Sequence, residues 1–444
     1  MFTCIKLKNF KSFKDVSIDL CSKRNIAKSL AVIYGINGSG KTTIAQAFLL
    51  LRRTIETMEV RGVLNDILEE RISPPEDFPV KQDAALQMLK TRLSMKGIEQ
   101  IINNYKMVDS KENMSVEYCF VINGNSGSYY IEMDENCIVK ERLEYKLSKR
   151  RGCYFNIEDD EISINSKIFE SKELYNLIYK QAKMLWGKHS LLSILIYEMS
   201  DKADTFINSN ISGNLMDVLL HLTDIEFKLG SGKDYATEDC ILENLQMGMV
   251  KTTEENLLNQ VEEMLDIFFK SIFKDVVKVF YQKTFDENKI RYRLYLRKCI
   301  EEKVYDIDFS LESTGTKEIL GLIPAFVAAA SGKCVVIDEY GIRMHDLLSA
   351  KLLEAISGQI TGQIIMTTHN TLIMECENLS PESLYFIMDD KTFKKSVKCI
   401  TEIEERLHPN YNYRTRYLTN NLYEDSMPST IDDLDLSGLV SLFK

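Results

Sequence analysis

The sequence lacks the features that mark several classes of protein. Its ten cysteines form no Cys-x-x-Cys pair, which argues against a zinc or dithiol motif, and free thiols in this number suit a reducing cytoplasm. With seven prolines and no low-complexity stretch, we expect little disorder outside the C-terminal tail. No apolar run is long enough to span a bilayer, and the lysine-rich N-terminus lacks a signal-peptide core. We therefore expect a cytoplasmic protein with no membrane partner.

Positive charge is also scarce. The 444 residues carry 55 Lys and Arg against 66 Asp and Glu, so the net charge is −11. A nucleic-acid surface covering the whole fold is therefore not indicated, although a local basic patch remains possible. The hydrophobic content of 45% is that of a globular chain, and the length allows two or more lobes.

The most informative segment is residues 35–42, GINGSGKT, between an apolar strand pattern at 30–34 and a helical pattern from 43 onward. Strand, glycine loop and helix form the context of a phosphate-binding P-loop, in which backbone N–H groups and the helix dipole bind phosphate. A glycine turn with a chance lysine is the simpler alternative, but both flanks fit the P-loop. The nucleotide-binding candidates here are Gly35, Asn37, Gly38, Ser39, Gly40, Lys41, Thr42 and Thr43.

A second motif is the apolar strand pattern 335–337 followed by Asp338 and Glu339. After a P-loop, such a strand delivers an aspartate toward Mg²⁺, so Asp338 and the Thr42 hydroxyl are the predicted metal ligands. Glu339 can act as the general base that polarises the attacking water. ATP and Mg²⁺ are the predicted cofactors.

Two further segments complete the set. Ser313 and Gly315 open a helical pattern about 25 residues before Asp338; they indicate either a simple N-cap or a second phosphate site, which could serve a neighbouring subunit. His369 ends an apolar strand pattern 30 residues after Glu339. A lone histidine is often structural, but this position suits a γ-phosphate sensor, so His369 joins Glu339 as a predicted catalytic residue.

Strands that alternate with helices predict an α/β fold. Residues 116–147 have the pattern of a β-meander with turns at 123–125 and 134–136, and 167–275 is helical in pattern, with an apolar face at Leu257, Val261, Leu265, Ile267 and Phe268. We expect four regions: an N-terminal half at 1–165, a helical insert at 166–276, a C-terminal half at 277–410 and a tail at 411–444.

Together the four motifs resemble the ABC-type ATPase heads of the SMC/RecF/OLD class, whose first strands are similar to residues 9–13. The Glu-Ser-Thr-Gly-Thr-Lys, Asp-Glu and Thr-Thr-His-Asn segments look most like bacterial RloA/AbiLi-type AAA-family ATPases, a type that includes the ATPase subunit of the PARIS anti-phage system. The resemblance covers roughly residues 1–60, 110–150 and 280–400. It implies a P-loop NTPase of ABC/SMC-head type, with a mixed sheet, a β-meander and an inserted helical lobe.

The resemblance also implies partners. Two subunits would sandwich ATP between the P-loop of one and Ser313–Gly315 of the other, as a homo-oligomer that controls a separate effector such as a nuclease. A phage protein or a nucleic acid would be the trigger. A RecF-like DNA-repair ATPase that binds DNA directly, and a non-hydrolysing nucleotide-stabilised scaffold, are the alternatives.

The sequence departs from the class at several points. The signature segment at 312–315 lacks the double glycine of transporter ATPases. Gln82 and Glu141 are the candidates for the Q-loop residue that contacts Mg²⁺. The 75 residues after His369 are too few for a TOPRIM nuclease domain. Asp389-Asp390 reads as a hairpin turn rather than a metal site. The basic cluster Lys146, Lys149, Arg150 and Arg151 reads as a solvated loop, with nucleic-acid binding as the alternative.

Overall fold

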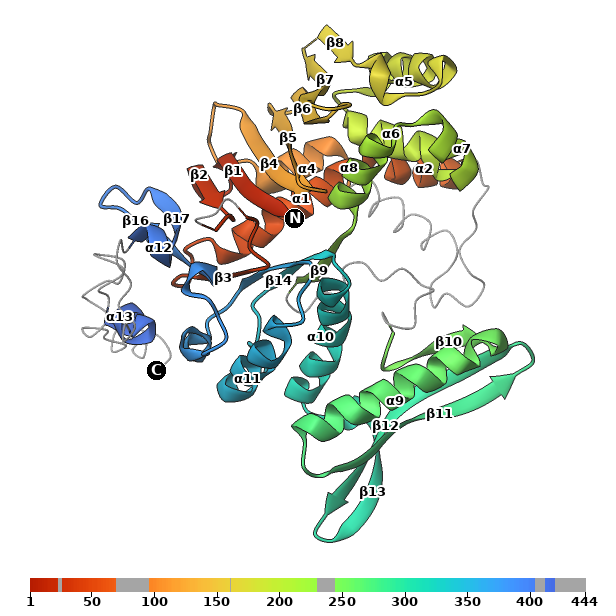
Figure 1. Cartoon of the computed structure of the whole chain (residues 1–444), viewed down its shortest axis with the longest axis vertical. Coiled ribbons are helices and arrows are strands. Elements are labelled where there is room, and N and C mark those ends of the chain that lie inside the picture. The colour runs from red at the N-terminus through yellow and green to blue at the C-terminus, as the bar shows by residue number, and fades with distance from the viewer. Residues whose placement is uncertain (23–25, 69–95, 160, 230–243, 404–411, 420–444) are drawn as a thin grey trace, which may run out of the picture.

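The computed structural model describes residues 1–22, 26–68, 96–159, 161–229, 244–403 and 412–419, and within them the chain folds around three β-sheets (Figure 1). The predicted α/β class is confirmed, and the strands form a mixed central sheet and two antiparallel sheets. No helix in the described part of the chain has both the length and the apolarity to cross a membrane.

The central sheet has the strand order β17-β16-β3-β15-β14-β9. Its strands are β3 (Leu30–Tyr34), β9 (Ile225–Leu229), β14 (Cys334–Asp338), β15 (Gln363–Thr367), β16 (Leu384–Asp389) and β17 (Lys395–Cys399). Only β17 runs antiparallel to its neighbour. Every residue of β3, β14 and β15 is buried, as expected for parallel strands covered on both faces. The carboxyl ends of these three strands therefore meet at one edge of the sheet.

Three helices flank this sheet: α1 (Lys41–Ile55), α10 (Thr314–Ala330) and α11 (Asp346–Ser357). Figure 1 shows α10 and α11 on the opposite side of the sheet from α1. The helix α1 contacts β14 and β15, and its Ala47 carbonyl accepts a hydrogen bond from Tyr118 of the second sheet. Most of α1 is thus buried between two sheets, which fixes the P-loop at its N-terminus.

The second sheet is antiparallel, with the order β2-β1-β4-β5-β6-β7-β8. It comprises β1 (Phe2–Phe10), β2 (Phe13–Asp19), β4 (Met114–Ile122), β5 (Asn125–Met133), β6 (Ile138–Lys146), β7 (Arg151–Glu158) and β8 (Glu161–Ile164). The predicted meander and both of its turns are confirmed; Asn123 and Gly124 have positive φ, as a tight hairpin turn requires.

Helices pack along this second sheet, with contacts that extend from β1 to β8. They are α2 (Thr57–Leu68), α4 (Ile98–Tyr105), α5 (Lys172–Leu185), α6 (Leu191–Ser200), α7 (Asp204–Asn210) and α8 (Gly213–Thr223). The helical pattern predicted for 167–275 is correct for α5 to α8 and for the helix at 255–272, but wrong at 225–229 and 247–251, which are strands. The first of these, β9, pairs with β14 as an edge strand of the central sheet. Residues 225–229, IEFKL, alternate apolar and polar side chains, which is a strand pattern inside a mostly helical region.

The third sheet comprises β10 (Met247–Lys251), β11 (Val276–Asp286), β12 (Lys289–Ile300) and β13 (Lys303–Asp308), with α9 (Glu255–Ile272) on one face. Leu258, Val261, Leu265 and Phe269 of α9 share a core with β11 and β12. The predicted apolar face of α9 is therefore partly wrong, since Leu257 and Ile267 are exposed. The domain boundary expected at residue 276 falls between α9 and the strands on which α9 packs.

The last two helices of the described residues are short, α12 (Ile400–Ile403) and α13 (Tyr413–Leu418). Asp390 accepts hydrogen bonds from the backbone N–H groups of Thr392 and Lys394 between β16 and β17, so the hairpin turn predicted at Asp389-Asp390 is confirmed. The predicted tail at 411–444 lies outside the described residues except for 412–419, and so does Gln82.

Candidate nucleotide-binding site

The predicted P-loop lies between β3 and α1 at the carboxyl edge of the central sheet. Gly38 and Gly40 have φ of 78° and 113°, which favour glycine, and a Cβ on Gly40 would lie 2.9 Å from the Phe13 ring. Gly40 has no side chain with which to cap α1, so the N–H groups of Lys41 and Thr42 at the start of the helix are left for another acceptor. An anion fits this helix terminus.

Lys41 is folded back onto its own loop. Its Nζ donates to the carbonyl oxygens of Gly35 at 2.7 Å and Ile36 at 3.0 Å, and the residue is only 6% exposed. Burial lowers the pKa of Lys41, while the nearby Asp338 and Glu339 oppose that shift. The Ser39 hydroxyl is buried and has no hydrogen-bond partner within the described chain. A cation and an unsatisfied hydroxyl in one glycine loop are the chemistry that a nucleotide phosphate requires.

The remaining P-loop candidates differ in exposure. Asn37 and Thr42 are exposed, whereas Thr43 is buried and its N–H donates to the Gly40 carbonyl at 3.0 Å. The Thr42 hydroxyl is therefore accessible to a metal ion, and Thr43 supports the first turn of α1.

Sequence reasoning missed a lysine that contacts the same loop. Lys395 begins β17, and its Nζ donates to the Gly38 carbonyl at 2.8 Å. It comes more than 350 residues after the loop, and no spacing rule in the sequence connects the two. The sequence pattern around 384–399 can indicate two paired strands, but it does not indicate that they lie beside the P-loop.

Asp338 and Glu339 lie at the end of β14, and a threonine on the neighbouring strand binds both. Thr367 Oγ1 donates to Asp338 Oδ1 at 2.6 Å and accepts from the Glu339 N–H at 2.8 Å. Glu339 has a φ of 60°, the left-handed region that a glutamate rarely adopts. Because such strain concentrates at functional sites, this backbone supports a functional role for Glu339. Sequence analysis gave Thr367 no role.

His369 follows β15, between the ends of β3 and β14 in the strand order. The residue is exposed overall, but partial burial of the ring, together with the charge of Lys41, lowers its pKa. Glu339 and Asp338 oppose this shift. The imidazole is thus uncharged at neutral pH and lies within electrostatic reach of both predicted motifs. The structure therefore brings Lys41, Asp338, Glu339 and His369 to one edge.

Ser313 and Gly315 lie elsewhere, at the start of α10. Ser313 is exposed and caps the helix, since its Oγ accepts from the Thr316 N–H at 3.1 Å. A Cβ on Gly315 would lie 2.8 Å from the Arg343 carbonyl, so the chain packs too closely there for a side chain. Within the described chain, Ser313 hydrogen-bonds to Thr316 and Lys317 of the same helix. The structure confirms the capped helix start and leaves a phosphate role for Ser313 as a prediction.

Glu141 is not a Q-loop residue in this structure. It is fully buried, and its carboxylate accepts hydrogen bonds from Tyr129, Trp186 and the backbone N–H of Leu191. With these donors around both oxygens, it has no access to a metal ion in the P-loop.

A family model described as "AAA domain, putative AbiEii toxin, Type IV TA system" matches residues 30–375. The chain belongs to this AAA family. A second AAA-domain model matches residues 4–51. The longer AAA match begins at β3 and ends after His369, so it includes the P-loop, the Asp338–Glu339 strand end and the start of α10. Membership supports an ATPase of AAA type.

Solved structures similar to this AAA protein are SMC heads. The SMC head domain from Thermotoga maritima has 15% identity and a TM-score of 0.37, over 90% of this chain and 98% of its own. The Smc head with an extended coiled coil from Pyrococcus furiosus, bound to the C-terminal domain of ScpA, has 16% identity and a TM-score of 0.39, over 89% and 95%.

Proposed function

We propose that this protein is an ATP-binding, Mg²⁺-dependent ATP-hydrolysing switch. The observation that carries the proposal is the convergence of Lys41, the Asp338–Glu339 pair and His369 at one edge of the central sheet. The uncapped α1 terminus and the unpartnered Ser39 hydroxyl support a triphosphate in the glycine loop.

Each side chain then has a role that its position supports. Lys41 would leave the Gly35 and Ile36 carbonyls and bind the β- and γ-phosphates. Thr42 and Asp338 would hold Mg²⁺, which neutralises phosphate charge when bound. Glu339 would accept the proton of the attacking water. His369, uncharged at neutral pH, would contact the γ-phosphate and report whether it is present.

The position of Ser313 supports a homo-oligomer. Its hydroxyl is exposed at the N-terminus of a 17-residue helix, with Gly315 beside it, and its contacts lie within that helix. We propose that this terminus completes the ATP site of a second copy. ATP would then hold two subunits together, and hydrolysis would release them.

We further propose that the switch is the ATPase sensor or scaffold of a bacterial anti-phage system and controls a separately encoded effector, for example a nuclease. The family description, which names a toxin–antitoxin system, and the motif resemblance to RloA/AbiLi-type ATPases support this role. Isolation of the protein from infected cells, followed by mass spectrometry of bound proteins, would identify the effector and the trigger.

Glu339→Gln tests the catalytic step. ATP should still bind, because Lys41, Thr42 and Asp338 remain, but hydrolysis should fall by roughly two to four orders of magnitude, the usual share of general-base catalysis. Lys41→Ala should lose ATP binding in calorimetry while the fold persists. Glu287→Gln is the matched control, since Glu287 also has positive φ but lies in the β11–β12 turn.

If Glu339→Gln hydrolyses ATP at the wild-type rate, Glu339 is not the general base. That result would favour a scaffold that does not depend on ATP hydrolysis. Unchanged ATP affinity in Lys41→Ala would exclude the P-loop assignment.

A further inference from the structure

The third sheet has one face covered by α9 and one face that α9 leaves open. On β12, the buried residues Ile290 to Leu296 alternate with residues on the opposite face. Because cross-strand partners share a face, the strand register identifies the open side. It includes Lys289, Arg291, Arg293, Tyr295 and Arg297 of β12, together with their partners on β10, β11 and β13.

Aromatic side chains lie at the centre of this open face. Tyr295 and Phe280 are cross-strand partners, and their rings stack with centroids 5.8 Å apart and planes at 22°. The Arg297 guanidinium lies 5.3 Å from the Phe280 ring centroid. On the other side of Tyr295 is a hollow of about 730 Å³, lined by Tyr295, Arg291, Arg293, Gln282 and two methionines. The hollow is large enough for a base to extend the stack at Tyr295.

The open face is also basic. Along β10 to β13 it carries six cations, Lys251, Lys278, Lys289, Arg291, Arg293 and Arg297, against Asp286, Asp306 and Asp308, a net charge of +3 (six minus three) in a chain of net charge −11. Asp306 and Asp308 lie on β13 and bond Arg297 and Arg293. Arg291 is 64% exposed in its side chain and lies 3.7 Å from Asp286, which is equally exposed.

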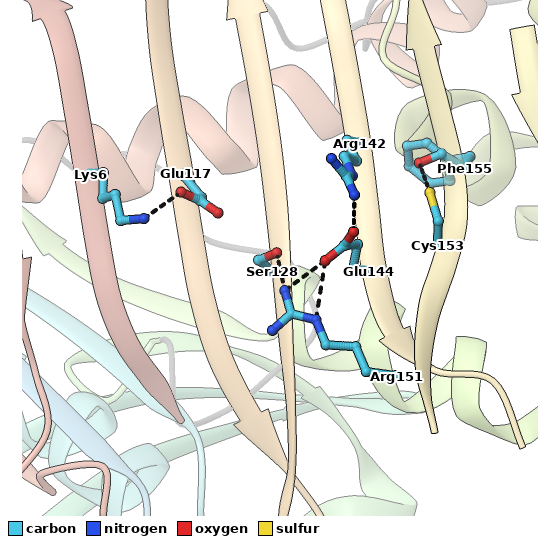
Figure 2. Close-up of polar contacts among 8 residues, drawn as sticks. All are labelled: Lys6, Glu117, Ser128, Arg142, Glu144, Arg151, Cys153 and Phe155. Atoms are coloured by element: carbon cyan, nitrogen blue, oxygen red, sulfur yellow. Dashed lines mark hydrogen bonds and ion pairs between the residues drawn. The ribbon is translucent and has the colours of Figure 1, made fainter. Parts of the chain in front are cut away.

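The open face of the second sheet provides a contrast (Figure 2). There Lys6 bonds Glu117 at 2.9 Å, and Arg151 of the predicted basic cluster bonds Glu144 and Ser128, both at 2.8 Å. Arg142 bonds the same glutamate. Each of these three bases bonds a glutamate, so their positive charge is partly neutralised before an anionic partner arrives.

We propose that the open face of the third sheet binds single-stranded nucleic acid. Tyr295 would stack on a base in the hollow, and Lys289 and Arg291 would contact phosphates. Stacked aromatics on a sheet with basic neighbours favour single strands, whose bases are free to stack, over an acidic protein, which needs no aromatic platform. The inference does not rest on the ATP site, because the surface belongs to a different sheet.

Fluorescence anisotropy with labelled 20-nucleotide single strands and the matching duplex tests this inference at 50 and 200 mM salt. Lys289→Glu/Arg291→Glu should weaken single-strand binding at least tenfold and flatten its salt dependence, because phosphate contacts release counterions. Tyr295→Ala should weaken binding about tenfold with an unchanged salt slope, and Tyr295→Phe should restore it. Lys172→Glu/Lys180→Glu on α5 changes the net charge equally and should bind like wild type.

Circular dichroism and ATP affinity should match wild type in all of these variants, which separates loss of this surface from loss of the fold or of the proposed ATPase. Absence of single-strand binding by wild type at 50 mM salt would overturn the proposal. So would an equal loss in the α5 control, stronger binding of the duplex, or binding of polyglutamate in place of the single strands.

Discussion

At the scale of single residues, Glu141 is the group with the clearest pH consequence. It lies on β6, is fully buried, and joins that strand to the start of α6 through the Leu191 N–H at 2.7 Å and Trp186 Nε1 at 2.9 Å. Burial raises its pKa to about 7, and the hydrogen bonds that it accepts only partly offset this shift. In the unfolded chain its pKa returns to about 4.3, the usual glutamate value.

The stability contributed by Glu141 should therefore fall as the pH rises from about 4.5 to about 7, because the unfolded state releases a proton that the native state still holds. Glu141→Gln does not titrate, and it places an amide N–H against buried donors, so it should be less stable than wild type. The stability difference between the two, measured by urea denaturation, should shrink by about 2–3 kcal/mol between pH 5 and pH 8. A constant difference would mean that Glu141 is ionised throughout.

The sequence predicts site residues only where their spacing is local. Residues 35–43 are contiguous in the sequence, and Asp338 and Glu339 follow one apolar run, so the sequence predicts both groups. Thr367 and Lys395 reach the site from neighbouring strands, through hydrogen bonds that no local pattern contains. Glu141 is the opposite case, a residue whose position in the sequence suggests a metal ligand. In the structure its carboxylate accepts hydrogen bonds from protein donors and cannot reach the P-loop.

At the scale of elements, α9 shows what packing adds to periodicity. The sequence pattern places Leu265 and Ile267 on one apolar face, but the structure buries Leu265 completely and leaves Ile267 65% exposed. Two residues along a helix are about 200° apart, so one core cannot receive both.

Leu265→Ala should destabilise the protein by about 2–5 kcal/mol, because it leaves a cavity between α9 and the third sheet. Ile267→Ala on the same helix should cost less than about 0.5 kcal/mol, as surface substitutions usually do. Urea denaturation of both variants checks the prediction. Equal losses would mean that Ile267 is covered in solution, for example by another copy of the chain.

The strands of the central sheet also differ in how well the sequence predicts them. The strands β14 and β15 were predictable from apolar runs that end in polar residues, whereas β9 was assigned to a helical region. Its sequence IEFKL alternates apolar and polar residues, and it pairs with β14 from Cys334↔Ile225 to Asp338↔Leu229.

At the scale of the whole molecule, the proposed composite site predicts complementation between variants. Lys41→Ala and Ser313→Arg should each lack ATPase activity, since each breaks every site of a homo-oligomer. A mixture should regain activity, because the intact P-loop of one subunit meets the intact Ser313 of the other.

Lys41→Ala mixed with Glu339→Gln is the control for this experiment. Both substitutions lie on the same side of the site, so no mixed pair has a complete site and the mixture should stay inactive. Activity in a strictly monomeric sample would contradict the proposed assembly.

The Thr367 contacts have a consequence for the time scale on which the catalytic edge opens. The amide hydrogens of Glu339 and Tyr340 bond to the hydroxyl and the carbonyl of this single residue, at 2.8 Å each. Deuterium can replace either hydrogen only when β14 and β15 separate at that end, although Glu339 is not fully buried. The exchange of these two neighbouring amides therefore reports breathing of the sheet beneath the proposed ATP site. If the proposed ATP site is correct, a nucleotide that bridges Lys41 and Asp338 should slow both exchanges together.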